Sequence, residues 1–193
     1  ARIVSSLTLI GAVGFLFFYF QPFPPRPPAS LHEAIGEVTA EQTLRLLGPD
    51  GRVLVIAREI REFEKSAGAV QLSAFNRALK KAGKEAAVTR LVKIDPDRIM
   101  AVPPGDFLEL LRKTSEKDVV ASFMGPPNLG AANQLGANHA RVVAICTGPM
   151  PGMVDLRELF AGGLIHAAIV DRPGAIMSSS NPPSGRSWFD QLY

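Results

Sequence analysis

The sequence predicts an α/β protein: a mostly parallel sheet of five strands with helices on both faces, preceded by one N-terminal transmembrane helix. Two observations support this fold class. After residue 48, five short apolar runs alternate with segments of helical periodicity, and parallel neighbours need crossover connections of that kind. Before them, residues 3–20 carry no charge and lead into a proline-rich stretch.

Residues 1–21 form the predicted transmembrane signal anchor. At about 1.5 Å of rise per residue, the uncharged run would cover about 27 Å, close to the thickness of a hydrocarbon core. Aromatic residues gather at its end, where rings favour the membrane interface, and Phe15, Phe18 and Tyr19 are expected to contact integral membrane subunits. The alternative is a secretory signal peptide that is removed, whose apolar region usually has about 7–15 residues.

Residues 22–38 are predicted to be a spacer, because their prolines deny the backbone helix and sheet hydrogen bonds. The α/β domain is expected over residues 39–176. Thr39-Ala40-Glu41-Gln42 fits a capping box and opens its first helix, which stops at Gly48. The strands are expected in the apolar runs within residues 51–58, 86–94, 118–125, 141–148 and 166–174, with intervening helices at 71–81, 103–111, 131–135 and 156–160.

The runs "GRVLVIAREI…LSAFNRALKKAG", "PPGDFLELLRKTSEKDVVASFMGPP" and "LRELFAGGLIHAAIVDRPG" together resemble one lobe of a type 1 periplasmic binding protein, of the sugar-binding and LacI-like superfamily. The resemblance implies small ligands, often sugars, bound in a cleft between two similar lobes. This chain has residues for only one lobe, so a cleft of that kind would need a partner to supply its other wall.

Ligands of open parallel sheets gather at the carboxyl ends of the strands. Six polar residues at these ends are the candidate ligand-binding residues: Arg58, Asp95, Asn128, Thr147, Asp171 and Arg172. The alternative is that they are ordinary polar residues of surface loops, because a fold does not fix a function.

The sequence carries no signature of an enzyme. The turn after the first strand lacks G-x-G-x-x-G, no phosphate-binding P-loop is present, and Cys146 falls inside an apolar run where burial is expected. The three histidines are far apart in the sequence, so neither a metal site nor a cofactor is predicted. Acidic and basic residues alternate at a net charge of +3, which argues against nucleic-acid binding.

The C-terminal residues 177–193 are too rich in Ser, Pro and Gly to belong to the sheet, yet they end in side chains typical of interfaces. The expected partner-docking residues there are Trp188, Phe189, Leu192 and Tyr193. The alternative is that this tail folds back on its own domain.

These features favour a non-catalytic, single-span accessory subunit of a multi-subunit bacterial membrane complex, for example a respiratory or photosynthetic one. Its expected partners are integral membrane subunits and the lipid bilayer, and Arg2 before the anchor favours a periplasmic domain on the inner membrane. The alternative function is a membrane-tethered sensor or receptor for a small, sugar-like molecule, with the two lobes supplied by a dimer.

Overall fold

A computed structural model describes residues 29–59, 66–93, 102–126, 139–148, 154–172 and 189–190. They contain one five-stranded sheet with the order β2-β1-β3-β4-β5, in which every neighbouring pair is parallel. The predicted parallel sheet is therefore confirmed. Its strands are β1 (Val53–Arg58), β2 (Ala86–Val92), β3 (Val119–Ser122), β4 (Arg141–Cys146) and β5 (Ala167–Val170).

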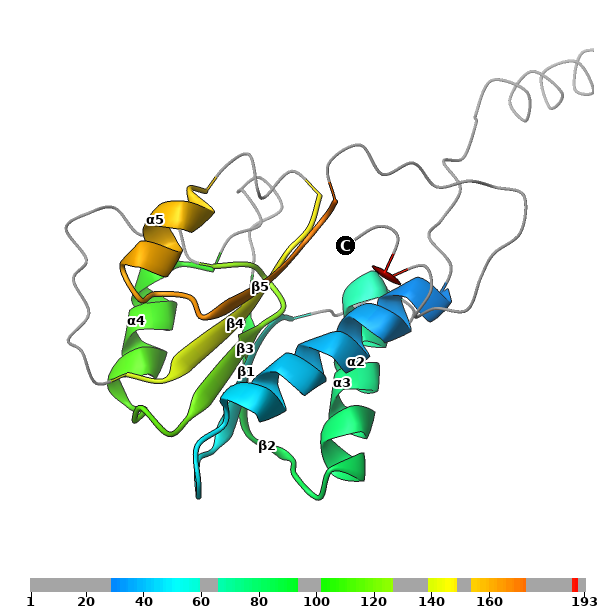
Figure 1. Cartoon of the computed structure of the whole chain (residues 1–193), viewed down its shortest axis with the longest axis horizontal. Coiled ribbons are helices and arrows are strands. Elements are labelled where there is room, and N and C mark those ends of the chain that lie inside the picture. Colours follow the sequence, from blue (N-terminus) through cyan, green and yellow to red (C-terminus); the bar gives the residue numbers. More distant parts are fainter. Residues whose placement is uncertain are drawn as a thin grey trace, which may run out of the picture.

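Helices cover the sheet on both of its faces, as Figure 1 shows. The helices α2 (Ala29–Leu46) and α3 (Ala67–Lys81) lie on one face, and α4 (Pro104–Arg112) and α5 (Leu156–Ala161) lie on the other. The helix predicted at residues 131–135 lies outside the described residues.

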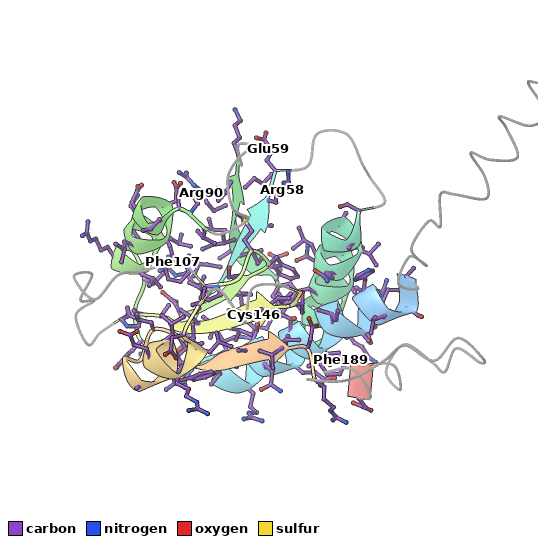
Figure 2. The ribbon with its side chains drawn as sticks, turned by 90° about the horizontal axis from the view of Figure 1, so that it is seen from above. Arg58, Glu59, Arg90, Phe107, Cys146 and Phe189 are labelled. Atoms are coloured by element: carbon purple, nitrogen blue, oxygen red, sulfur yellow. The ribbon has the colours of Figure 1, made fainter. Side chains whose placement is uncertain are left out.

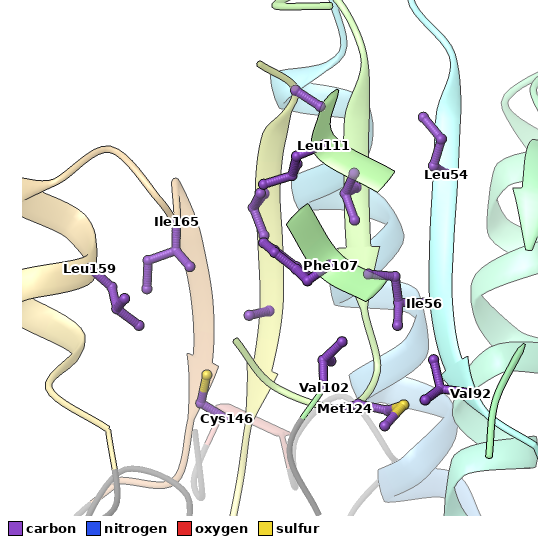
Figure 3. Packing of buried hydrophobic residues seen from close by; sticks show 14 residues of the cluster. Leu54, Ile56, Val92, Val102, Phe107, Leu111, Met124, Cys146, Leu159 and Ile165 are labelled. Carbon is purple, nitrogen blue, oxygen red and sulfur yellow. The ribbon is translucent and has the colours of Figure 1, made fainter. Parts of the chain in front are cut away.

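The core is divided between the two faces by the alternation of side chains along each strand. On the α4 and α5 face, Leu54 and Ile56 of β1 pack with Phe107 and Leu111 of α4 (Figure 3). On the other face, the alternate residues of β1 pack against Phe75 and other apolar side chains of α3. All four residues of β3 are buried, since both of its faces are covered.

Helix α2 begins earlier than the sequence pattern predicts. It is already helical at Ala29, inside the range expected to be a spacer, and it places Leu31 and Ile35 against β4 and β5. Thr39 is not a cap: its hydroxyl donates to the carbonyl oxygen of Ile35 at 2.7 Å, in the middle of the helix. The capping-box pattern was misleading because the apolar face of the helix continues upstream of it.

The predicted membrane helix requires a correction. Within the described ranges, no helix is both long enough and apolar enough to cross a membrane. The longest of these helices, α2, has 18 residues but carries charged side chains, among them Glu33, Glu37 and Arg45. The fold class that the structure supports is the α/β domain with its parallel sheet, and residues 1–28, where the anchor was expected, lie outside the described residues.

Gly36 allows α2 and α3 to approach each other closely. A Cβ atom at this position would lie 2.2 Å from the carbonyl oxygen of Gln71 and 3.0 Å from the Cβ atom of Ala74. Both of those groups belong to α3, so the two helices meet backbone to backbone at this point.

We therefore expect Gly36→Ala to lower the free energy of unfolding by roughly 1–3 kcal/mol, because the added methyl group must push the helices apart. Gly105→Ala is the matched control, since nothing lies within 4 Å of a Cβ atom at that helical position. Urea unfolding followed by circular dichroism would measure both. Equal stability of the two variants would contradict the close contact.

Candidate functional site

The six residues predicted as a ligand site are not gathered into one cluster by the described structure. Asp95 and Asn128 lie outside the described residues. Arg58 ends β1, whereas Asp171 and Arg172 follow β5, and β3 and β4 stand between those strands. At about 4.8 Å per strand, that separation is roughly 14 Å.

Asp171 and Thr147 do come together at the carboxyl ends of β4 and β5. A carboxylate oxygen of Asp171 accepts a hydrogen bond from the backbone N–H of Gly148 at 2.5 Å. Thr147, one residue earlier, is half-buried. The Asp171 carboxylate therefore links the ends of two neighbouring strands, a structural role that accounts for its position without a ligand.

Cys146 is buried, as the sequence predicts. Burial raises the pKa of its thiol to about 12, so the reactive thiolate is scarce at neutral pH. The side chain packs in the apolar cluster beneath α4 and α5, where it behaves as a small hydrophobic residue (Figure 3).

The fold brings together two histidines that the sequence separates. The rings of His139 and His166 lie with their centroids 6.3 Å apart and their planes at 80°. The Nδ1 atom of His139 donates to the carbonyl oxygen of Ala140 at 2.8 Å, and that of His166 accepts from the N–H of Val142 at 3.2 Å. Burial, helped by the charges of His139 and Arg141, lowers the pKa of His166.

This arrangement does not suit a metal ion. Because Nδ1 of His166 accepts a hydrogen bond, the proton of the neutral ring sits on Nε2, which then has no lone pair to offer. Within the described part of the chain, no group of three or more histidine, cysteine, aspartate or glutamate side chains could hold a metal.

Asp118 is a buried carboxylate with a structural explanation. Its side chain is 3% exposed and contacts Arg52 at 2.8 Å. Burial would raise the pKa of this carboxyl, but hydrogen bonds from the Arg52 side chain and from the N–H groups of Ser115 and Arg52 lower it to about 2. The carboxylate joins the segments that lead into β1 and β3.

Strand β2 offers a different kind of site. Among the described residues it pairs only with β1, so its outer edge presents unpaired backbone N–H and C=O groups. Residues 87–91 are all exposed, whereas residues 53–57 of the neighbouring β1 are all buried. Val88 is 44% exposed and Leu91 is 52% exposed. These are two of the three exposed large apolar side chains among the described residues, the third being Phe160 of α5.

A groove runs beside this strand on the α4 side. It is open to solvent and has a volume of about 300 Å³, with apolar walls from Leu54, Val88 and Leu110. Ion pairs lie along its rim: Arg90 contacts Asp106 at 3.0 Å, and Lys113 contacts Glu109 at 2.6 Å. We call the outer edge of β2, its side chains Val88 and Leu91 and this groove the β2 surface.

The charges of the β2 surface do not define a ligand. Each basic side chain that lines the groove is paired with a carboxylate, Arg90 with Asp106, Lys113 with Glu109 and Arg52 with Asp118. The groove therefore favours neither an anion nor a cation. What the surface offers is a row of backbone hydrogen-bonding groups flanked by apolar side chains. An extended polypeptide supplies the complement to both.

Sequence reasoning missed this surface because "AAVTRLVKI" has the apolar content of a buried strand. The available signal was Arg90 in the middle of the run, since charged residues are common on edge strands. Figure 2 shows Arg90 on the side of the domain that carries β2 and α4.

The residues predicted for partner docking are mostly outside the described ranges, namely Phe15, Phe18, Tyr19, Trp188, Leu192 and Tyr193. Phe189 is described, and it packs against Leu31, Ile35, Ile145 and Ile169 of its own domain (Figure 2). At this residue the tail contacts the domain from which it extends.

No protein-family model matches the chain, and no curated protein matches it in sequence.

The pKa of Asp118 leads to a prediction about stability. A carboxyl whose folded pKa lies near 2 rather than 3.8 stabilises the fold by about 2 kcal/mol above pH 5, and this contribution is lost as the pH falls toward 2. We expect Asp118→Asn to lower the free energy of unfolding by about that amount at pH 7, and the difference from the parent protein to shrink between pH 5 and pH 2.

Urea titrations at several pH values would measure this difference. Glu109→Gln is the matched control, because it removes a carboxylate from an exposed ion pair with Lys113 and should change stability little. A difference between Asp118→Asn and the parent that stays constant down to pH 2 would show that the carboxylate is not the stabilising group.

Proposed function

We propose that this chain is a non-catalytic accessory subunit of a larger assembly, and that it binds another polypeptide along strand β2. The observation that carries the proposal is the exposure of β2: an edge strand with Val88 exposed on one face and Leu91 on the other. A strand added to that edge would satisfy the backbone groups and cover both side chains.

The titratable groups support the same proposal. The described side chains with strongly shifted pKa values, Asp118 and Cys146, are explained by the folding of the domain, and neither faces the groove at β2. The groove itself is open to solvent and bordered by ion pairs, so its side chains suit contact with a partner's side chain better than catalysis. A bacterial membrane complex is the host that we propose, and the role proposed for β2 does not depend on which assembly the host is.

The second candidate is a receptor for a small ligand at the carboxyl edge of the sheet. It is favoured by the strand order, because the helices after β1 and β2 lie on opposite faces and a crevice of this kind often binds ligands. Arg58, which ends β1 beside this crevice, would then contribute a polar contact, whereas Asp171 lies three strands away. Arg58→Ala should weaken ligand binding while leaving assembly with other proteins intact.

The accessory role is tested by isolating the tagged full-length chain from its native cells in mild detergent and weighing the intact particle by mass spectrometry. We expect stoichiometric co-isolation with other protein chains, reduced at least tenfold by Leu91→Asp because a carboxylate would be buried at the contact. Phe160→Asp is the matched control, since it places the same carboxylate at another exposed apolar position, on α5.

Two outcomes would count against this function. A particle containing only this chain would exclude the accessory role. Equal loss of partners in the Leu91 and Phe160 variants would exclude β2 as the binding edge.

A further inference from the structure

We infer that the polypeptide seated on β2 is the β2 strand of a second copy of this chain, so that two sheets join into one across a two-fold axis. The inference rests on the proposed function of β2 as a protein-binding edge, and it names the partner. The two strands run antiparallel, with Thr89 of one copy opposite Thr89 of the other.

Symmetry limits the registers that two identical strands can adopt. Residues that lie opposite each other in an antiparallel pair point to the same face of the sheet. In a two-fold pair, one residue must therefore lie opposite its own copy, with the axis midway between the two. Arg90 is the only charged residue within β2. A pair centred on Arg90 would set two guanidinium groups opposite each other, which is unfavourable.

The register centred on Thr89 avoids that repulsion. It sets the two threonines opposite each other, a pairing that can form a hydrogen bond, and it sets Val88 of each copy opposite Arg90 of the other. Arg90 is held by Asp106 of its own copy at 3.0 Å, on the α4 side of the sheet. Its aliphatic stem can therefore lie over Val88 of the second copy while its charge stays paired.

The ends of the strand also complement each other. Glu85 precedes β2 and Lys93 follows it, so the register centred on Thr89 brings each glutamate toward the lysine of the other copy. The pairing of β2 with β1 is irregular near Ala86, where the register shifts. Regular hydrogen bonding between the copies is therefore expected over residues 88–90, with the charged pairs flanking it.

Both faces of the joined sheet gain apolar cover. Val88 pairs in register with Leu54, whose side chain packs on the α4 side, and Leu91 pairs with Ala57, which packs on the α3 side. Each copy thus contributes one exposed apolar side chain to each face of the interface. A copy of the same strand therefore adds apolar cover at this edge on both faces of the sheet.

The position of the axis can be tested with cysteine variants of the full-length chain in mild detergent. Thr89→Cys should form a disulfide-linked dimer under mild oxidation, because opposite residues bring their Cα atoms to about 4.5–5.5 Å. Leu91→Cys is the matched control: the two copies of residue 91 are offset by about four residues, or roughly 13 Å, and should link at least tenfold more slowly. The native Cys146 can stay in place, since it is buried.

Charge reversal at Val88 tests whether the partner is a copy. Val88→Arg would face Arg90 of the second copy, whereas Val88→Glu would face the same residue with the opposite sign. We expect the dimer dissociation constant, measured by sedimentation equilibrium, to be at least tenfold higher for the arginine variant. Both variants lose the same apolar side chain at an exposed position, and circular dichroism would verify that both are folded.

The outcomes separate this inference from the proposed function. Equal dissociation constants for the two Val88 variants, or equal cross-linking at residues 89 and 91, would overturn the register. A chain that is monomeric at tens of micromolar, yet loses its other partners on Leu91→Asp, would overturn the dimer and leave the accessory role standing. A dimer with this charge dependence that isolates without other proteins would support the inference and exclude the accessory role.

Discussion

A parallel sheet has to be covered on both faces, and this requirement governs the whole domain. Strands β1, β3 and β4 meet it, since α4 and α5 pack over one face while α2 and α3 pack over the other. Helix α2 is essential to that arrangement, because it precedes β1 in the chain and yet covers the far side of the sheet at β4 and β5. The helices cover only the ends of strand β2: residues 87–91 are all exposed, Val88 and Leu91 among them.

The polar groups of the domain fall into two sets: buried groups that hold the fold together, and exposed ion pairs beside β2. The Asp118 carboxylate is satisfied by groups from the segments beside it, and Nδ1 of His166 is tied to the backbone of β4. Such contacts hold strands in place and leave little reactivity for chemistry. The ion pairs of Arg90 and Lys113 are exposed and contribute little to stability. At the interface proposed for β2, they would influence which chains can approach.

Apolar runs bounded by turn residues were enough to predict all five strands and their parallel arrangement. They could not reveal which strand lies at an uncovered edge, because "VLVIAR" of β1 and "AAVTRLV" of β2 differ little in apolar content while their burial differs completely. The predicted start of α2 was wrong for a local reason. Thr39 has the residue type of a helix cap, but its hydroxyl donates a hydrogen bond within the helix. The proximity of His139 to His166 depends on the pairing of β4 with β5, which no spacing in the sequence encodes.

The ends of the described domain lie close together. The first turns of α2 and residue Phe189 both pack on Ile145 and Ile169, near the carboxyl ends of β4 and β5 (Figure 1). The two flanking segments therefore leave the domain from neighbouring positions on its surface. A pulling force between those segments would first act on the packing of α2 and Phe189 against Ile145 and Ile169. Because the C-terminal segment continues from β5, the same force would then reach the sheet at the edge opposite β2.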